Sequence, residues 1–355
     1  MTCELGARYL FQENIQTMSS NAEINASPQH FMVSKRRGNK IHIRCYLPKS
    51  VNKSTRILFF AHGYAAHCNR KHSFIEFFSR LSANGIVVFA HDHVGHGYSS
   101  GMRSHISDFE ALLDDWEDLI DLVTGNNEAE VRAIFGDSLS ENVISLLPSL
   151  SFILSGMSLG GLVSSRMAQR LASKTPLLLG HSNLAGLVLL CPLIETPPGV
   201  PRFIEVIIRW LVMFFSCGHL EMPGFLDSTL DDGGVNPYNR TQIGADLMEK
   251  DDQNLPGGLG YKGNIRWDTG FAILDGTRAL DFASIKKHDC PVLCFHDPED
   301  KIVGISNSYT LITEIKHPKS KLVCLNDGRH DLLGNDIEDV ATIVAGTVDW
   351  ITTLD

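Results

Sequence analysis

The chain has 355 residues, of which 43% are hydrophobic and 20% charged, proportions that are ordinary for a globular protein with a large buried core. Its formal net charge is −10, whereas binding to a nucleic-acid backbone needs a basic surface that displaces counterions. Composition and charge therefore exclude a nucleic-acid-binding protein.

The first 28 residues are polar and show no periodic pattern, which predicts a loose N-terminal extension. They carry charges where a secretory signal peptide needs an apolar stretch. Eight cysteines are spread along the chain, several of them inside apolar runs, where a buried and reduced thiol is the simplest interpretation. The only close pair, Cys290 and Cys294, has no second pair to complete a zinc ribbon. These features predict a reducing, cytoplasmic location.

From residue 31 onwards, alternating residues on either side of a Gly-Asn pair predict a β-hairpin. Nearly continuous apolar runs follow, as in strands of a parallel sheet that is covered on both faces. They are ILFFAHG (57–63), IVVFAHD (86–92), SFILSG (151–156), LAGLVLLCP (184–192), PVLCFHD (291–297) and KLVCLND (321–327). Apolar residues at helical spacing lie between them, at 72–85, 106–125, 158–172 and 337–351. This alternation predicts an α/β fold with a mostly parallel, doubly wound sheet.

Two segments interrupt the alternation of strands and helices. Residues 125–150 are polar to amphipathic, and residues 193–283 form a long excursion after which strands resume. We therefore expect one domain over 29–355 with an inserted helical cap, not two independent domains. The predicted helix at 106–125 carries a cluster of acidic residues, which we expect to form a solvated face. They are Asp114, Asp115, Glu117 and Asp118.

The stretch SFILSGMSLGGLVSS places Ser158 directly after a predicted strand and before a predicted helix. Gly156 and Gly160 stand two residues before and after it, which gives the G-x-S-x-G pattern of a nucleophile elbow. Taken alone, the pattern allows two interpretations. The glycines serve only the tight packing of strand and helix, or they permit a strained turn that exposes a nucleophilic serine.

A nucleophilic serine needs a base and a carboxylate that orients the base, here in the chain order serine, acid, histidine. Two later predicted strands end in such residues. The first leads into a loop with Asp297, Glu299 and Asp300, and the second leads into His330. Because the carboxyl ends of parallel strands meet at one edge of the sheet, we expect these residues to emerge near Ser158.

Four motifs stand out in this order: HGYAAH (62–67), DHVGHGYSSG (92–101), GMSLGG (156–161), and HDPEDKIV with GRHDLL (296–303 and 328–333). Together they resemble the α/β-hydrolase superfamily, and closely its monoacylglycerol lipase and lysophospholipase group. The resemblance implies an α/β-hydrolase fold in which Ser158 is the nucleophile, Asp300 the acid and His330 the base. It also implies an oxyanion hole made by the backbone N–H groups of Tyr64 and Leu159.

The chain departs from the family pattern at three positions. The family usually has Gly where Asp297 stands, which makes Asp297 the reserve candidate for the acid. Tyr64 is bulkier than the small residue common there, and Met157 replaces a frequent histidine beside the nucleophile. The resemblance implies ester hydrolysis through an acyl-enzyme, with no metal and no organic cofactor.

The segment FIEVIIRWLVMFFS (203–216) is too short to span a membrane and contains charged residues. On a helix, Glu205, Arg209 and Ser216 share one narrow stripe, and the remaining surface is apolar. Two interpretations are open: a cap helix packed over the pocket, or a lid face that makes peripheral contact with membrane or lipid aggregates. Either one favours an apolar ligand, so we expect a lipid ester such as a monoacylglycerol or a lysophospholipid.

Other functions remain open. The same acyl-enzyme serves an acyltransferase, and a small carboxylic ester is an alternative substrate. An aminopeptidase would need an acidic pocket for a substrate ammonium, and no cap carboxylate can be assigned to that place. A hydrolase fold also serves catalytically silent ligand-binding proteins. No pattern in the sequence defines acyl length, head group or oligomeric state.

A histidine motif permits a metal-site interpretation. His91, His93 and His96 form H-x-H-x-x-H, and imidazoles are common zinc ligands. Metallohydrolases with a related motif have Asp where this chain has Gly95. The simpler interpretation is a glycine-rich loop that shapes the floor of the pocket.

Overall fold

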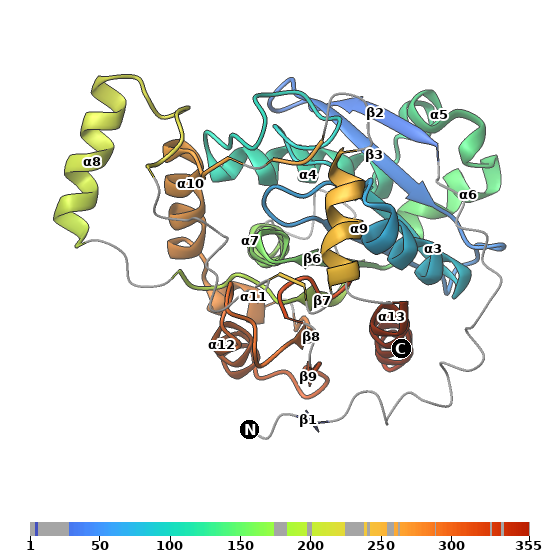
Figure 1. The fold of residues 1–355 in the computed structure, drawn as a ribbon. Helices are drawn as coiled ribbons and strands as arrows, with labels where there is room; N and C mark the ends of the chain where they lie inside the picture. The colour runs from blue at the N-terminus through green and yellow to red at the C-terminus, as the bar shows by residue number, and fades with distance from the viewer. Residues whose placement is uncertain are drawn as a thin grey trace.

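A computed structural model gives the fold of the chain (Figure 1). It describes residues 4–5, 28–173, 183–196, 201–223, 238–239, 242–253, 259–261, 263–287, 289–326, 329–334 and 337–354. Among the described helices, none combines the length and the apolar character that a bilayer-spanning segment needs.

The described strands form one nine-stranded sheet in the order β1-β9-β8-β7-β6-β4-β5-β3-β2. Their bounds are Glu4–Leu5 (β1), Gln29–Val33 (β2), Lys40–Tyr46 (β3), Arg56–Ala61 (β4), Ile86–His91 (β5), Phe152–Met157 (β6), Leu184–Leu190 (β7), Val292–His296 (β8) and Lys321–Cys324 (β9). The seven strands β1, β9, β8, β7, β6, β4 and β5 are parallel, each to its neighbours in the sheet. Strand β3 is antiparallel to both of its neighbours, β5 and β2. The predicted mostly parallel sheet with an initial hairpin is confirmed.

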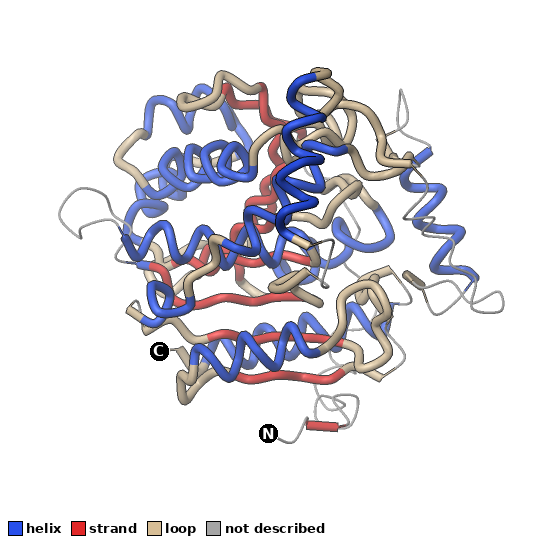
Figure 2. The backbone as a smooth tube through the Cα atoms, turned by 90° about the vertical axis from the view of Figure 1, so that its left-hand side faces the viewer, coloured by secondary structure: helices blue, strands red, loops and turns tan. Residues whose placement is uncertain are grey.

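Helices cover both faces of the sheet (Figures 1 and 2). Their bounds are Glu76–Ala83 (α3), Phe109–Thr124 (α4), Glu128–Phe135 (α5), Glu141–Leu146 (α6), Leu159–Ser173 (α7), Arg202–Phe214 (α8), Gln242–Gln253 (α9), Trp267–Arg278 (α10), Phe282–Lys286 (α11), Ser306–Ile315 (α12) and Ile337–Thr352 (α13). Residues of α3 and α13 pack in one hydrophobic cluster, and residues of α4, α7, α11 and α12 pack in the other.

Strand β4 shows why the strands of the sheet are almost continuously apolar. Phe59 belongs to the cluster under α4 and α7, whereas its neighbour Phe60 belongs to the cluster under α3. Both side chains are fully buried. Because successive residues of a strand point to opposite faces, a strand covered on both sides needs an apolar residue at every position.

The strand order reverses between β4 and β6. From β4 the chain continues to β5 on one side, and β6 then lies on the other side of β4. Loops that leave the carboxyl ends of two such strands diverge and open a crevice, which is the usual place for a ligand in an open α/β sheet. The loops concerned begin at His62 after β4 and at Ser158 after β6.

The expectation of a solvated acidic face on α4 is wrong. Asp115, Glu117 and Asp118 are at most 7% exposed. Arg36 of the hairpin turn forms an ion pair with Asp118, and Arg170 of α7 lies 3.2 Å from Glu117. The turn and α7 therefore cover the acidic face, and both contribute arginines that neutralise it.

The structure differs from the sequence-based expectations in the N-terminal extension and at one cysteine. Within the predicted loose extension, Glu4–Leu5 form β1, the edge strand of the sheet, which pairs in parallel with β9. Six described cysteines are free thiols, and five of these are buried. Cys324, at the end of β9, is instead disulfide-bonded, so the expectation of a reduced thiol fails at this position.

The two predicted insertions both contain helices. Residues 125–150 form α5 and α6, whose residues Val131, Phe135 and Ile144 are buried in the same cluster as α4. The excursion between β7 and β8 contains α8, α9, α10 and α11. In Figure 1, α8 projects from the body of the molecule beside α10.

Candidate active site

Ser158 lies in a sharp turn between β6 and α7. Its backbone has φ +55°, a left-handed conformation that is uncommon for residues other than glycine. Its N–H donates to Leu190 O at 3.0 Å, and its carbonyl accepts from Gly161 N–H at 2.9 Å and Leu193 N–H at 3.0 Å. Hydrogen bonds from two neighbouring segments thus hold the serine in the strained conformation.

The flanking glycines leave no room for side chains. A Cβ on Gly156 would lie 2.2 Å from Gly160 O, and a Cβ on Gly160 would lie 1.9 Å from Ala61 O. Both distances are far below any real contact of a Cβ atom. The two interpretations of the G-x-S-x-G pattern are therefore compatible, because the close packing of the glycines is what permits the strained turn at Ser158.

His330 and Asp300 emerge from the loops after β9 and β8. Nδ1 of His330 lies 2.8 Å from Oδ2 of Asp300, and both residues are at most 6% exposed. The second carboxylate oxygen, Oδ1, accepts the N–H groups of Ile302 at 2.8 Å and Val303 at 2.9 Å. With Nδ1 committed to the carboxylate, Nε2 of His330 is the nitrogen left to exchange a proton with a substrate or nucleophile.

The carboxyl group of Asp300 is held in its charged form. Burial alone raises the pKa of Asp300, but the neighbouring imidazoles of His296 and His330 outweigh burial and lower that pKa well below the usual range. His296 Nε2 lies 3.4 Å from the oxygen that His330 contacts. An ionised carboxylate fixes the tautomer of the imidazole and stabilises its protonated form.

Asp297, the reserve candidate for the acid, makes different contacts. It is fully buried, its Oδ1 accepts the N–H of Glu299 at 2.7 Å, and its Oδ2 accepts the N–H of Arg329. The carboxylate thereby joins the loop of Asp300 to the residue directly before His330. The structure brings Asp300 and not Asp297 to the imidazole, and the third acidic residue of the loop, Glu299, is exposed.

The two backbone N–H groups expected to form an oxyanion hole belong to the loop after β4 and to the start of α7 after β6. A Cβ on Gly63 would lie 3.3 Å from Ser158 Cβ, which places the loop of Tyr64 directly beside the serine. Within the described part of the chain, neither Tyr64 N–H nor Leu159 N–H has a hydrogen-bond acceptor. Leu159 begins α7, and the first N–H groups of a helix are free to bind negative charge.

The segment after β7 connects the serine to the histidine. Leu193 N–H donates to Ser158 O at 3.0 Å, and the Cys191 thiol donates to His330 O at 3.1 Å. The turn after β6 and the loop after β9 are thus both hydrogen-bonded to the short segment 191–193. This arrangement brings the loops of Ser158 and His330 together at one edge of the sheet.

Two parts of the predicted cap contact the site. The ring of Tyr238 lies edge-on to His330, with centroids 6.0 Å apart. Asp252 of α9 forms a bidentate ion pair with Arg70 at 3.0 Å for each bond, and it also bonds Nε2 of His67 at 3.1 Å. The cap is therefore attached both to the histidine loop and to the loop that carries Tyr64.

Two groups of described residues have potential metal-ligating atoms within 4.8 Å of one another. One consists of Cys191, Asp300 and His330 and belongs to the site already described. The other consists of His42, Cys68 and Asp92. The carboxylate of Asp92 already accepts Cys68 N–H at 2.7 Å and Tyr98 N–H at 2.9 Å, and it bonds His42 at 2.8 Å. The carboxylate of Asp92 is thus already engaged by three groups of the protein itself.

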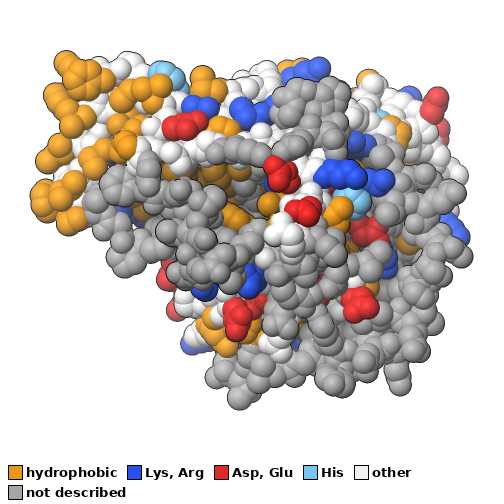
Figure 3. Space-filling model, in the orientation of Figure 1, with side chains coloured by type: hydrophobic (Ala, Val, Ile, Leu, Met, Phe, Trp, Pro, Cys, Tyr) orange, Lys and Arg blue, Asp and Glu red, His pale blue; other side chains and the backbone are white. Residues whose placement is uncertain are grey.

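The polar stripe of α8 faces the body of the molecule, and its apolar surface faces outwards. Glu205 accepts hydrogen bonds from Arg209 at 2.8 Å and from Arg278 of α10 at 2.6 and 2.7 Å. The apolar residues of α8 that are more than two-fifths exposed are Phe203, Val206, Ile207, Trp210, Leu211, Met213 and Phe214. They cover the projecting end of the molecule with hydrophobic side chains (Figure 3). The expectation of a cap helix with its apolar surface packed over the pocket is therefore not met.

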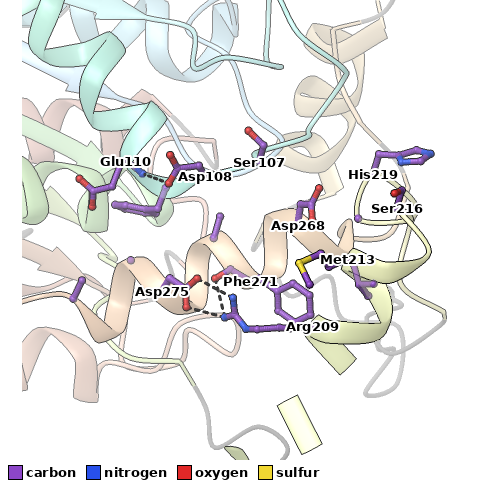
Figure 4. A pocket seen from close by; sticks show the side chains of 16 residues that line it. Ser107, Asp108, Glu110, Arg209, Met213, Ser216, His219, Asp268, Phe271 and Asp275 are labelled. Carbon is purple, nitrogen blue, oxygen red and sulfur yellow. Dashed lines mark hydrogen bonds and ion pairs between the residues drawn. The ribbon is translucent and has the colours of Figure 1, made fainter. Parts of the chain in front are cut away.

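A pocket of about 640 Å³ lies between α8, α10 and the start of α4 (Figure 4). Apolar side chains such as Met213 and Phe271 line it together with the ion pair of Arg209 and Asp275, at 2.7 and 2.9 Å. None of the proposed catalytic residues lines this pocket. Beside it, the ion pairs of Glu205 and Arg209 join α8 to α10.

Known proteins resemble this chain over most of its length. The monoglyceride lipase of Mus musculus is 23% identical over 316 residues, which cover 89% of this chain and 88% of that protein. The monoglyceride lipase of Homo sapiens is 24% identical over the same shares of both chains. The solved structure of a soluble variant of monoglyceride lipase from Saccharomyces cerevisiae with a substrate analog has a TM-score of 0.67 at 17% identity, covering 94% of this chain and 98% of that one.

The model of the Hydrolase_4 family, described as serine aminopeptidase S33, matches residues 52–140 and 137–338. The structural neighbours share the α/β-hydrolase fold, and the family and its relatives indicate a hydrolase of the lipase or esterase type. The matched residues make up most of the chain and include both the elbow and the histidine loop. The chain belongs to the Hydrolase_4 (serine aminopeptidase, S33) family and has an α/β-hydrolase fold.

Proposed function

We propose that the chain is a serine hydrolase that cleaves carboxylic esters of lipids, monoacylglycerols or lysophospholipids, through an acyl-enzyme. The observation that carries the proposal is the strained turn of Ser158, at φ +55° between two glycines that admit no side chain. Such a turn costs free energy of order 1–3 kcal/mol and is retained where the exposed side chain has a function. The bond between His330 and Asp300 supports the same proposal.

In the proposed acylation step, Ser158 Oγ attacks the ester carbonyl carbon and His330 Nε2 takes the hydroxyl proton. Asp300 keeps the Nδ1–H of His330 aimed at itself and stabilises the imidazolium. Negative charge that develops on the carbonyl oxygen is stabilised by the N–H groups of Tyr64 and Leu159. In comparable sites each such donor lowers the barrier by about 3–4 kcal/mol.

The tetrahedral intermediate then collapses with cleavage of the ester bond. His330 gives its proton to the departing alcohol, which leaves Ser158 esterified with the acyl group. Water enters, His330 takes one of its protons, and the resulting hydroxide attacks the acyl carbon. Release of the carboxylic acid returns the proton to Ser158, so the cycle needs no other reactant than water.

The outward face of α8 supports a lipid as the substrate. A helix with one polar stripe and a broad apolar face can lie in a membrane interface, with the apolar side chains among the acyl chains. In this chain the stripe of Glu205 and Arg209 is bound to α10, so the apolar face is presented as a unit. We infer peripheral membrane contact through α8, which would place the site near esters that dissolve poorly in water.

The proposal is tested with a fluorophosphonate probe and a panel of substrates. We expect the probe to label the folded parent protein and to leave Ser158→Ala unlabelled. The panel contains monoacylglycerols, lysophospholipids, short p-nitrophenyl esters and aminoacyl p-nitroanilides, each assayed with and without added alcohol. We expect hydrolysis of the long-chain esters to be fastest. A folded parent that does not react with the probe would contradict the serine mechanism, and preference for the anilides would favour an aminopeptidase.

A further inference from the structure

Three buried histidines form a hydrogen-bonded chain that ends on the backbone beside Ser158. His62 follows β4, His91 ends β5 and His93 follows β5, and each is at most 1% exposed. The rings of His62 and His93 lie 4.3 Å apart, and those of His91 and His93 lie 4.8 Å apart. Two of these residues belong to the H-x-H-x-x-H motif, whose function the ester chemistry leaves unassigned.

The backbone partners determine which nitrogen of each ring carries the proton. His93 N–H donates to His62 Nε2 at 3.0 Å, so His62 must carry its proton on Nδ1. That Nδ1–H then donates to Gly63 O at 2.7 Å. His93 Nε2 faces the carbonyl of His62 at 3.1 Å and must donate to it, which leaves its Nδ1 to accept from His91 Nε2 at 3.2 Å.

The environment keeps the three rings neutral, as this pattern requires. Burial lowers the pKa of His62 and of His93 well below the usual value, and it lowers the pKa of His91 to about 4. Five of the six ring nitrogens bond to one another or to backbone N–H and C=O groups. Among the described residues, these three histidines are not a group whose ligand atoms come together as in a metal site. At the far end, His91 stacks on Trp116 of α4, with centroids 5.7 Å apart.

The chain of bonds acts on one particular peptide group. Gly63 O, which accepts from His62 Nδ1 and also from Ala66 N–H at 3.2 Å, belongs to the same planar unit as Tyr64 N–H. In a trans peptide the C=O and N–H bonds point in opposite directions. Holding the oxygen of Gly63 on one side therefore aims the Tyr64 N–H at the other side.

We propose that His62 and His93 are positioning residues of the oxyanion hole, which fix the peptide between Gly63 and Tyr64 so that its N–H points to the reacting oxygen. His62 holds the carbonyl of that peptide, and His93 holds both the ring and the carbonyl of His62. His91 supports the ring of His93 in turn. The proposal rests on the proposed function, because the charge that the N–H meets arises only in ester cleavage.

The two positions permit a matched test, because Asn places its amide near Nδ1 of histidine and Gln places its amide near Nε2. At position 93 the decisive bond is made by Nε2, so His93→Gln preserves it and His93→Asn removes it. At position 62 the decisive bond is made by Nδ1, so His62→Asn preserves it and His62→Gln removes it. The better substitute is thus expected to be Gln at position 93 and Asn at position 62.

The test measures kcat and KM for a p-nitrophenyl ester, together with the melting temperature, for the parent and all four variants. We expect His93→Asn and His62→Gln to lose about 10- to 100-fold in kcat, as small displacements of catalytic groups do, with KM changed less than two-fold. We expect His93→Gln and His62→Asn to retain kcat within about three-fold of the parent. These losses should not follow the melting temperature.

Equal kcat for Asn and Gln at both positions, or a loss confined to KM, would overturn the proposal. Where a variant at 93 or 62 fails to fold, the comparison uses His91→Gln and His91→Asn, because only Gln keeps the donor to His93 Nδ1. The proposal then requires His91→Gln to have a higher kcat than His91→Asn. A parent without Ser158-dependent ester hydrolysis contradicts the proposed function, whereas an active parent without these preferences contradicts only the role of the histidines.

Discussion

Asp297 accepts a hydrogen bond from the N–H of Arg329, the residue directly before His330. Its other oxygen accepts the N–H of Glu299 in the loop of Asp300. A buried carboxylate whose two oxygens bond two different loops holds those loops at a fixed separation. The bond between His330 and Asp300 therefore depends on Asp297 for its geometry, although Asp297 does not contact the imidazole.

The two acidic residues should respond differently to the same substitution. Asp300→Asn removes the charge that stabilises protonated His330 and favours the wrong tautomer, so we expect kcat to fall by about 10⁴-fold with the fold intact. Asp297→Asn keeps the size of the side chain and one acceptor oxygen, so we expect a loss of at most about ten-fold, since that oxygen can still accept one of the two backbone N–H groups through a neutral hydrogen bond. Steady-state kinetics on a soluble ester measures both variants. An active Asp300→Asn beside an inactive Asp297→Asn would reverse the assignment of the acid.

The elbow should tolerate no side chain at Gly160. A Cβ there would lie 1.9 Å from Ala61 O, so β4 and α7 would have to separate. We expect Gly160→Ala to lower the free energy of unfolding by about 3 kcal/mol or more and to abolish labelling by a fluorophosphonate. Gly304→Ala is the matched control, because the nearest atom to a Cβ at that position is Ser306 Oγ at 3.5 Å. Equal labelling of Gly160→Ala and the parent would show that the turn is not strained by its neighbours.

The sequence predicted the strands well because each is an uninterrupted apolar run. In β4 and β6 the two faces are buried by different helices, so each strand is a run of apolar residues, although burial continues past the end of β4 at His62 and Gly63. The elbow was also predictable, because Gly156, Ser158 and Gly160 lie within five residues of each other and the strain is local.

The sequence could not predict features that depend on distant partners. The acidic residues of α4 are buried because Arg36 and Arg170, far away along the chain, lie against them. Periodicity identified the polar stripe of α8, but it could not show whether the stripe faces solvent or protein. Likewise, the choice between Asp297 and Asp300 depends on how two loops separated by about thirty residues meet, which no local pattern encodes.

Glu205 provides a pH-dependent attachment of α8 to α10. Hydrogen bonds from Arg278 and Arg209 lower the pKa of Glu205 to about 2, below the value of about 4.3 in an unfolded chain. A group with a lowered pKa stabilises the fold fully above its unfolded pKa, and this contribution disappears as the pH falls towards 2. We expect Glu205→Gln to lose about 1 kcal/mol in unfolding free energy at pH 7, because both guanidinium groups remain partly in water.

Urea unfolding of the parent and of Glu205→Gln at pH 7 and at pH 2.5 measures this contribution. The difference between the two proteins should be smaller at pH 2.5, where the parent's carboxylate is partly protonated. Glu141→Gln is the control, since Glu141 pairs with Arg132 on the open surface and should make no measurable difference at either pH. A difference for Glu205→Gln that is unchanged at pH 2.5 would contradict the lowered pKa.

The exposed face of α8 should bind lipid surfaces. Trp210 is 56% exposed and its ring stacks on Phe214, with centroids 5.3 Å apart, so the two rings can enter a bilayer interface together. Burial of one such side chain stabilises binding by about 1.5–3 kcal/mol, and a charge at the same place opposes it. We expect Trp210→Glu to weaken partitioning to neutral phosphatidylcholine vesicles by at least about ten-fold. Hydrolysis of a short water-soluble ester should be unchanged.

Val33 supplies the control for this experiment, because it is 66% exposed on β2, away from α8. Val33→Glu adds the same charge, so it should leave vesicle binding within about two-fold of the parent. If both substitutions weakened binding equally, net charge and not the face of α8 would govern the interaction. If neither did, the apolar face of α8 would have to serve another purpose, because seven exposed apolar side chains on one helix are costly in water.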